Sequence, residues 1–154
     1  MSLSLNTRSA PPVRSSFAHF ISITTRWMDN DVYGHVNNVV HYSLFDTAVN
    51  RWLIEQGALD IHAGAVIGLV VETHCNYFAS ITFPQTVHAG LRVARVGASS
   101  VRYEVGLFAD GAQEAAALGH FVHVYVARDT RRPVTALPAA LLAALRPLQL
   151  STAD

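Results

Sequence analysis

The apolar positions of this chain change their spacing at one point. Between residues 17 and 27, β-branched and aromatic residues recur at every second position, which predicts a β-strand. From Asn38 onward the spacing becomes helical, and a broad apolar face is formed by Leu44, Phe45, Ala48, Val49, Trp52 and Leu53. Gly57 follows in the position where glycine usually ends a helix. We therefore expect one strand and then a helix of about 19 residues, which is long for a small domain.

The rest of the chain alternates again and predicts four more strands, over residues 66–78, 86–96, 101–107 and 115–127. Turn signals separate them, including the strong hairpin signal Asp110-Gly111. Pro138 opens a short last helix that runs to about Arg146. An antiparallel sheet of about five strands with one strongly apolar helix has an obvious solution, in which the sheet wraps around the helix. The expected fold class is therefore α+β.

Composition narrows the classes of function. Hydrophobic residues make up 51% of the 154 residues and charged residues only 14%, so we expect a large buried subunit interface. The net charge is zero with histidine neutral, which argues against nucleic acid or an anionic membrane as a partner. No run approaches the roughly 20 apolar residues of a membrane span, and residues 1–16 lack the apolar core of a signal peptide. These features, with Cys75 as the single cysteine, favour the cytoplasm.

One domain is expected over residues 16–147, with a disordered polar arm over 1–15 and a short tail over 148–154. The eight histidines are scattered, and none has the spacing with Cys, Asp or Glu that is typical of a metal site. His120 and His123 lie three apart in a strand pattern, so they should face opposite sides of the sheet. We expect no metal ion.

The junction between the first strand and the long helix, residues 26–38, is unusually polar for its place. A helix start exposes unpaired backbone N–H groups, so a carboxylate beside it is in a common place for chemistry. Asp31 can attack a carbonyl or deprotonate water, but it is equally suited to a turn. Asp29 more simply caps a turn or pairs with Arg26, and the side chains of Asn37 and Asn38 more simply cap the helix.

The element Asp31-Val32-Tyr33-Gly34-His35-Val36-Asn37-Asn38, within this order of strands and helices, resembles the hotdog fold. More narrowly, it resembles the acyl-CoA thioesterases of the 4-hydroxybenzoyl-CoA thioesterase family. Phe83-Pro84 and Arg132-Pro133-Val134 fit the same pattern, and the likeness covers roughly residues 17–146. One departure concerns the substrate. The thioesterase that names the family has hydrophobic and aromatic residues after the glycine, whereas this chain has His-Val-Asn-Asn, as in relatives that act on fatty acyl thioesters.

The resemblance implies a homodimer or homotetramer whose sheets join edge to edge. An acyl thioester of coenzyme A or of acyl carrier protein would bind at the subunit interface and be hydrolysed to the free acid without a cofactor. The catalytic carboxylate falls on Asp31, as nucleophile or general base, and the amides that polarise the thioester carbonyl fall near Asn38. His35 either moves a proton or only hydrogen-bonds the loop.

Other residues are candidates for holding the substrate. Beside the carboxylate, Tyr33, Gly34 and Val36 are expected to contact it, because glycine allows a close approach to the backbone. Ser99, Ser100 and Arg102 are candidates for the phosphates of coenzyme A, although an arginine that is merely solvated is the simpler interpretation.

Two other functions fit the same sequence. His35 is compatible with a hotdog dehydratase or hydratase, whose chemistry typically uses a histidine over the β-carbon of the acyl group. A non-catalytic protein that binds acyl thioesters would share the apolar pocket. An acyl enzyme on serine or cysteine is disfavoured, because no serine-histidine-aspartate pattern is visible and Cys75 lies within a predicted strand.

Overall fold

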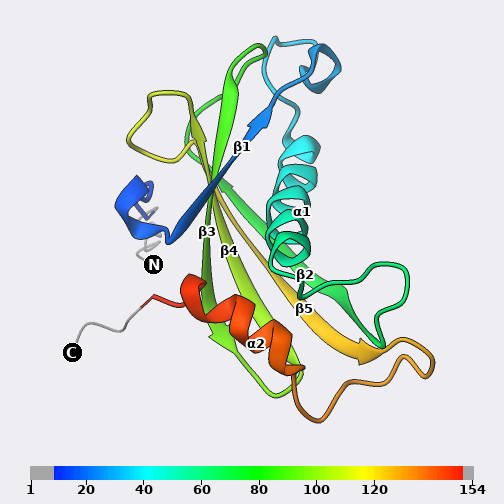
Figure 1. Ribbon diagram of the computed structural model, residues 1–154. Coiled ribbons are helices and arrows are strands. Elements are labelled where there is room, and N and C mark those ends of the chain that lie inside the picture. Colours follow the sequence, from blue (N-terminus) through cyan, green and yellow to red (C-terminus); the bar gives the residue numbers. More distant parts are fainter. Residues whose placement is uncertain (1–8, 151–154) are drawn as a thin grey trace, which may run out of the picture.

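A computed structural model describes residues 9–150 and contains one five-stranded antiparallel sheet with the strand order β1-β3-β4-β5-β2. The strands are β1 (His19–Thr24), β2 (Val66–Tyr77), β3 (Thr86–Val96), β4 (Ser100–Ala109) and β5 (Ala117–Ala127). Helix α1 (Asn38–Glu55) lies against one face of the curved sheet, and α2 (Ala139–Leu145) packs near one end of it (Figure 1). The predicted α+β fold, a five-stranded antiparallel sheet wrapped around a central helix, is confirmed.

The element boundaries follow the sequence pattern closely, with one exception. Helix α1 covers 18 residues and ends just before Gly57, whose φ of 69° is the left-handed conformation expected after a helix. The first strand is shorter than predicted, because the chain leaves the sheet after Thr24 and makes a 3₁₀ turn over Trp27–Asp29. Residues 25–27 thus continue the alternating pattern of a strand but do not pair with β3.

The apolar face of α1 is buried as its spacing predicts, and Phe45 and Trp52 are both core residues. Trp52 also donates from Nε1 to the carbonyl oxygen of Ala144 at 2.9 Å, which ties α1 to α2. The ring of Phe45 lies directly on the backbone of β5 at Gly119, where an added Cβ atom would come within 2.2 Å of the ring. Glycine suits this position because a side chain here would overlap the Phe45 ring unless the ring moved.

The predicted arm and tail need correction. Of the arm, residues 9–15 are described, and Arg14 is anchored on the β4–β5 turn by hydrogen bonds to the carbonyl oxygens of Ala112 and Ala109. Its guanidinium also lies 5.1 Å from the ring centroid of Phe108. At the other end Leu148 is buried, so the domain extends past residue 147. Residues 1–8 and 151–154 lie outside the described part. The sequence did not predict these contacts, because Arg14 and Leu148 each pack against residues that are distant in the sequence.

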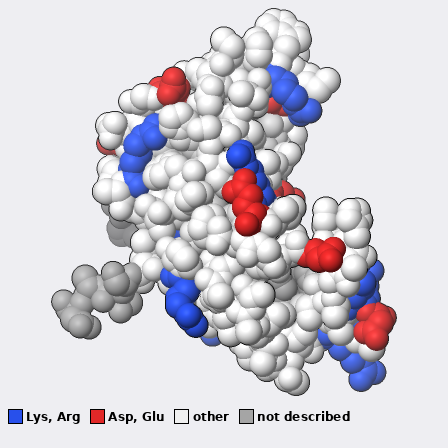
Figure 2. Space-filling view, viewed as in Figure 1, with Lys and Arg blue, Asp and Glu red and all other residues white. Residues whose placement is uncertain are grey.

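The charged side chains on the face shown in Figure 2 lie in small groups of both signs, separated by uncharged surface. Among the described residues, three ion pairs join an arginine to a carboxylate at 2.8 to 3.0 Å: Arg26–Asp29, Arg51–Glu55 and Arg92–Glu104. Within residues 9–150, none of the helices has the length and apolar character needed to cross a membrane.

The close contact between Phe45 and Gly119 gives a test of the core. Gly119→Ala should lower the free energy of unfolding by about 1–3 kcal/mol, because the new methyl group overlaps the Phe45 ring. In a Phe45→Leu background the same substitution should cost clearly less. Urea unfolding of the two single variants and the double variant measures the coupling. An equal cost of Gly119→Ala in both backgrounds would show that Phe45 is not the cause.

Candidate active site

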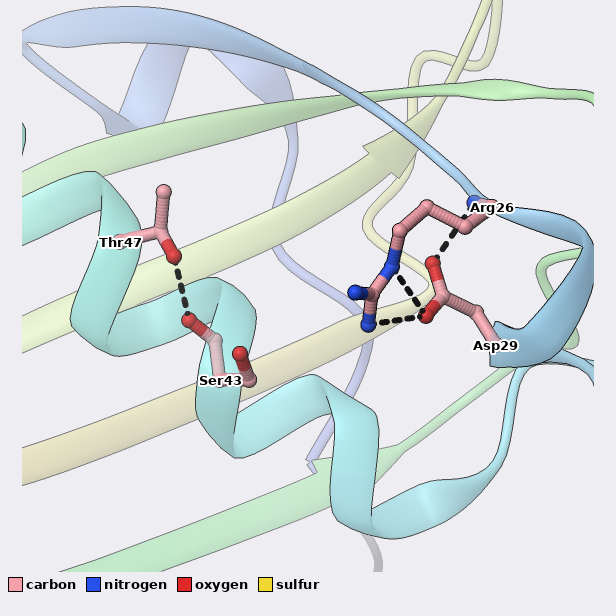
Figure 3. A network of polar contacts seen from close by, with 4 residues as sticks. All are labelled: Arg26, Asp29, Ser43 and Thr47. Atoms are coloured by element: carbon pink, nitrogen blue, oxygen red, sulfur yellow. Dashed lines mark hydrogen bonds and ion pairs between the residues drawn. The ribbon is translucent and has the colours of Figure 1, made fainter.

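Asp29 fixes the loop between β1 and α1. Its carboxylate is almost fully buried and accepts hydrogen bonds from the backbone N–H of Arg26 at 2.7 Å and from the Arg26 guanidinium at 2.8 and 3.0 Å (Figure 3). Burial alone would raise the pKa of Asp29, but these contacts with Arg26 outweigh it and hold the pKa below its ordinary value. The carbonyl oxygen of Asp29 accepts from the N–H of Asn37 at 2.8 Å. One residue therefore joins the end of β1 to the start of α1, and the predicted Arg26–Asp29 pairing is confirmed.

Asp31 opens a tight turn that ends at His35. Its N–H donates to the carbonyl oxygen of His35 at 2.8 Å, and Gly34 within the turn has a φ of 80°, which an L-residue with a side chain rarely adopts. One carboxylate oxygen of Asp31 accepts from the N–H of Tyr33 at 2.8 Å. The second carboxylate oxygen has no partner among the described residues. One oxygen thus holds the carboxylate in place, and the other is left to accept a hydrogen bond from a bound molecule.

The first turn of α1 is held from several sides. The side chain of Asn37 caps the helix by accepting from the N–H of Val39 at 3.2 Å. The Tyr77 hydroxyl donates to the carbonyl oxygen of Asn38 at 3.0 Å, and His41 donates from Nδ1 to that of Asn37 at 3.2 Å. Burial lowers the pKa of His41, and the hydrogen bond to the carbonyl oxygen of Asn37 opposes this shift without cancelling it. The N–H of Asn38 has no partner among the described residues, as expected for the first turn of a helix.

An open cleft of about 380 Å³ lies at this junction. Its lining consists of Asp31, His35, Val36 and Asn38 on one side and residues 77–80 on the other. Four of the predicted site residues therefore share one cleft. Tyr33 and Gly34 do not line it: Tyr33 is 81% exposed, and Gly34 shapes the turn instead. The sequence did not predict that residues 77–80, at the end of β2, form the other wall. These residues are distant from Asp31 in the sequence, and the pattern around a strand end does not show which segment it will contact.

The structure does not bring the candidate coenzyme residues to the cleft of the same chain. Ser99 and Ser100 lie at the β3–β4 turn, and Ser100 pairs with Val124, whereas the cleft lies near the opposite end of β5, where Tyr77 pairs with Ala117. Seven residues of strand separate these positions, which is about 24 Å. Arg102 faces away from α1 and contacts His120 at 3.2 Å and Glu104 at 3.9 Å. It is a surface arginine with partners of its own.

Cys75 and the two histidines of β5 do not line the cleft. Burial raises the pKa of the Cys75 thiol to about 11, so the thiolate is scarce at neutral pH. Within residues 9–150, no group of three or more His, Cys, Asp or Glu side chains is placed to hold a metal ion. As predicted, His120 and His123 lie on opposite faces of the sheet: the ring of His120 stacks on His74, and His123 is buried against Tyr103 and Phe121.

Comparison with known proteins places this chain in a family. The Thioesterase-like superfamily matches residues 25–145, so the chain belongs to that superfamily. A search of curated proteins finds no match. Among solved structures, the chain is similar to the PA5185 protein of Pseudomonas aeruginosa strain PAO1, with 57% sequence identity and a TM-score of 0.89 over 93% of this chain and 99% of that one.

Two further structures share the fold. The PA2801 protein of Pseudomonas aeruginosa, provisionally named a thioesterase, has 30% identity and a TM-score of 0.77 over 84% of this chain and 98% of that one. Slr0204 of Synechocystis, a 1,4-dihydroxy-2-naphthoyl-CoA thioesterase, has 18% identity and a TM-score of 0.74 over 82% of this chain and 94% of that one. The hotdog thioesterase resemblance is thereby confirmed.

The buried carboxylate of Asp29 predicts an acid-sensitive contribution to stability. Because its pKa is lower in the folded chain than the ordinary value of 3.8, Asp29 stabilises the fold above about pH 4 and loses this effect as pH falls through its folded pKa. Asp29→Asn should lower the free energy of unfolding by about 1–3 kcal/mol at pH 7, with a smaller difference at pH 3. Urea unfolding at both pH values measures this.

Glu55→Gln is the matched control. Glu55 also pairs with an arginine, at 2.9 Å, but both side chains are about half exposed, so the change should be within about 0.5 kcal/mol. A cost for Asp29→Asn that does not shrink between pH 7 and pH 3 would contradict the role of the ionised carboxylate.

Proposed function

We propose that this protein hydrolyses acyl thioesters and that the reaction takes place in the cleft at the start of α1. The observation that carries the proposal is the meeting of two groups in one cleft: a carboxylate oxygen of Asp31 and the backbone N–H of Asn38, both without partners among the described residues. Membership of the Thioesterase-like superfamily supports thioester hydrolysis in general.

The chemistry divides between these two groups. The N–H of Asn38, at the positive end of the α1 dipole, stabilises the negative charge that develops on the thioester oxygen; one such donor is typically worth about 3 kcal/mol of barrier. Asp31 either removes a proton from water, whose oxygen attacks the carbonyl carbon, or attacks that carbon itself to form an anhydride that water then cleaves. In both routes the carbon–sulfur bond breaks, and the thiolate leaves and is protonated. His35 lines the same wall of the cleft, and in this proposal it hydrogen-bonds the leaving sulfur.

The substrate is an acyl thioester of coenzyme A or of acyl carrier protein, and the reaction needs no cofactor. The similar fold of Slr0204, which acts on a coenzyme A thioester, favours coenzyme A as the carrier. Val36 and the side chains over residues 77–80 supply apolar surface for a fatty or aromatic acyl group.

Asp31→Asn tests the proposal directly. The amide oxygen of asparagine can still accept from the N–H of Tyr33, so the turn should persist while the base or nucleophile is lost. Turnover of acyl-CoA, followed by thiol release across a panel of acyl groups, should fall at least about 100-fold. Glu55→Gln, on the exposed surface of α1, should leave the rate unchanged.

The same panel separates the other two functions. A folded Asp31→Asn variant with the rate of the parent would exclude the proposed role of Asp31. Hydration of an enoyl thioester without release of thiol would indicate a hydratase and would favour His35 as its acid. Tight binding of acyl-CoA without hydrolysis of any acyl group would indicate a binding protein.

We also propose that the functional unit is a homodimer joined along β2. Among residues 9–150 this strand pairs only with β5, so its other edge lies at the end of the sheet. The edge carries exposed apolar side chains: Leu69, Val70 and Val71 are 36%, 48% and 62% exposed. Two such edges from two copies would extend one sheet across both subunits and bury these side chains.

A charge on the β2 edge should therefore separate the subunits. Val70→Lys should shift the chain from dimer to monomer at micromolar concentration, because pairing the strands would bury an unpaired ammonium group. Light scattering measures the molar mass of each variant in solution. Leu142→Lys places the same charge on the exposed side of α2, where Leu142 is 38% exposed, and should leave the dimer intact. A parent chain that is monomeric would refute the proposal.

A further inference from the structure

We propose that His41 is a positioning residue for the reaction: it holds the peptide group between Asn37 and Asn38 and so fixes the direction of the Asn38 N–H. The inference rests on the proposed function, in which this N–H stabilises the charge on the thioester oxygen. His41 lies in the first turn of α1 and is 3% exposed. It is not among the residues that line the cleft, so it acts through the backbone and not on the substrate.

The start of α1 has several backbone donors, and most of the first turn already uses them. The N–H of Val39 donates to the side chain of Asn37 at 3.2 Å, and the N–H of Val40 donates to the carbonyl oxygen of Asn37 at 2.9 Å. The N–H of Asn38, the first residue of the helix, has no partner among the described residues. The direction of this group therefore decides how well the helix start stabilises an oxyanion.

The Asn38 N–H belongs to the same planar peptide group as the carbonyl of Asn37. In a trans peptide the two groups point in opposite directions, so a contact that fixes the carbonyl also fixes the N–H. His41 makes such a contact, because its Nδ1 lies 3.2 Å from the carbonyl oxygen of Asn37. A carbonyl oxygen can only accept, so Nδ1 carries the proton and donates it. This hydrogen bond also polarises the peptide group and makes its N–H a stronger donor.

The ring of His41 is itself held in place. It packs edge-on against the ring of Tyr77, with the two centroids 4.9 Å apart and the planes at 77°. The hydroxyl of Tyr77 donates to the carbonyl oxygen of Asn38 at 3.0 Å, which fixes the next peptide group along the helix. His41 and Tyr77 thus hold two successive peptide groups, and His41 holds the one that carries the free N–H.

Three variants of His41 separate positioning from packing. The amide nitrogen of asparagine can take the place of Nδ1, whereas glutamine, one bond longer, brings its amide nearer the place of Nε2, and leucine has no donor. Glutamine is closer to histidine in volume than asparagine is, and it is the better helix former, so a purely structural role would favour His41→Gln over His41→Asn. The positioning role predicts the reverse order.

Release of thiol from the acyl-CoA that the parent cleaves fastest measures the effect. In His41→Leu and His41→Gln, kcat should fall about tenfold while KM stays within about twofold, because the lost interaction acts in the transition state. In His41→Asn, kcat should stay within about threefold of the parent value.

Thr47→Val is the matched control. The Thr47 hydroxyl donates to the carbonyl oxygen of Ser43 at 2.8 Å, so it also joins a side chain of α1 to a carbonyl four residues earlier, as His41 does (Figure 3). The variant removes this bond on the exposed side of the helix, away from the Asn38 N–H, and should leave kcat and KM unchanged.

The backbone reports the same contact without any reaction. In a ¹⁵N–¹H spectrum of the full chain, the Asn38 amide signal should move in His41→Leu and His41→Gln and stay near its parent position in His41→Asn, because a hydrogen bond at a carbonyl shifts the nitrogen of the same peptide group. If the parent cleaves no acyl-CoA, the proposed function fails, and this signal still decides whether His41 holds the peptide group.

Two results would overturn the inference. One is a kcat of His41→Gln equal to or above that of His41→Asn, which is the order that packing alone predicts. The other is an Asn38 amide signal at the same position in the parent, His41→Asn and His41→Gln. Both comparisons use the two polar variants, so they hold even if His41→Leu does not fold.

Discussion

The contact between Arg26 and Asp29 is the constraint on which the candidate site depends. A carboxylate buried as deeply as that of Asp29 is tolerated only with partners, and Arg26 supplies a backbone amide and a guanidinium. The backbone of Asp29 then accepts from Asn37, the cap of α1. The chain that leaves β1 is thereby tied to the start of the helix, and Asp31, two residues later, has little freedom in where it points.

The helix is fixed as firmly as the turn. Phe45 packs on bare backbone at Gly119, and Trp52 is bonded to the α2 backbone, so α1 has little room to slide or rotate on the sheet. Tyr77 holds the carbonyl of Asn38 from the opposite wall of the cleft. A polar site at a helix start gains its precision from the rigid apolar packing behind it, because helices and sheets position groups more accurately than loops do.

Most of the fold was predictable because strands and helices depend on the spacing of apolar residues that are close in the sequence. The period of two gave four of the five strands to within about two residues, and the helical period gave α1 and its end at Gly57. The first strand was predicted too long, since Trp27 fits the alternating pattern but belongs to the 3₁₀ turn that Asp29 closes. Likewise Arg14 looks like part of a solvated arm until the β4–β5 turn is brought against it.

The sequence by itself determined that polar residues gather at the junction of the first strand and the helix. It also determined that four of the predicted site residues are neighbours, because they are close along the chain: Asp31, His35, Val36 and Asn38. Only the tertiary structure decided the rest: the second wall at the end of β2, the separation of Ser99 and Ser100 from that cleft, and the burial of His123. The physical reason is the same in each case. Periodicity reports which face of an element is apolar, whereas the partner of a side chain depends on strands and loops that lie far away in the sequence.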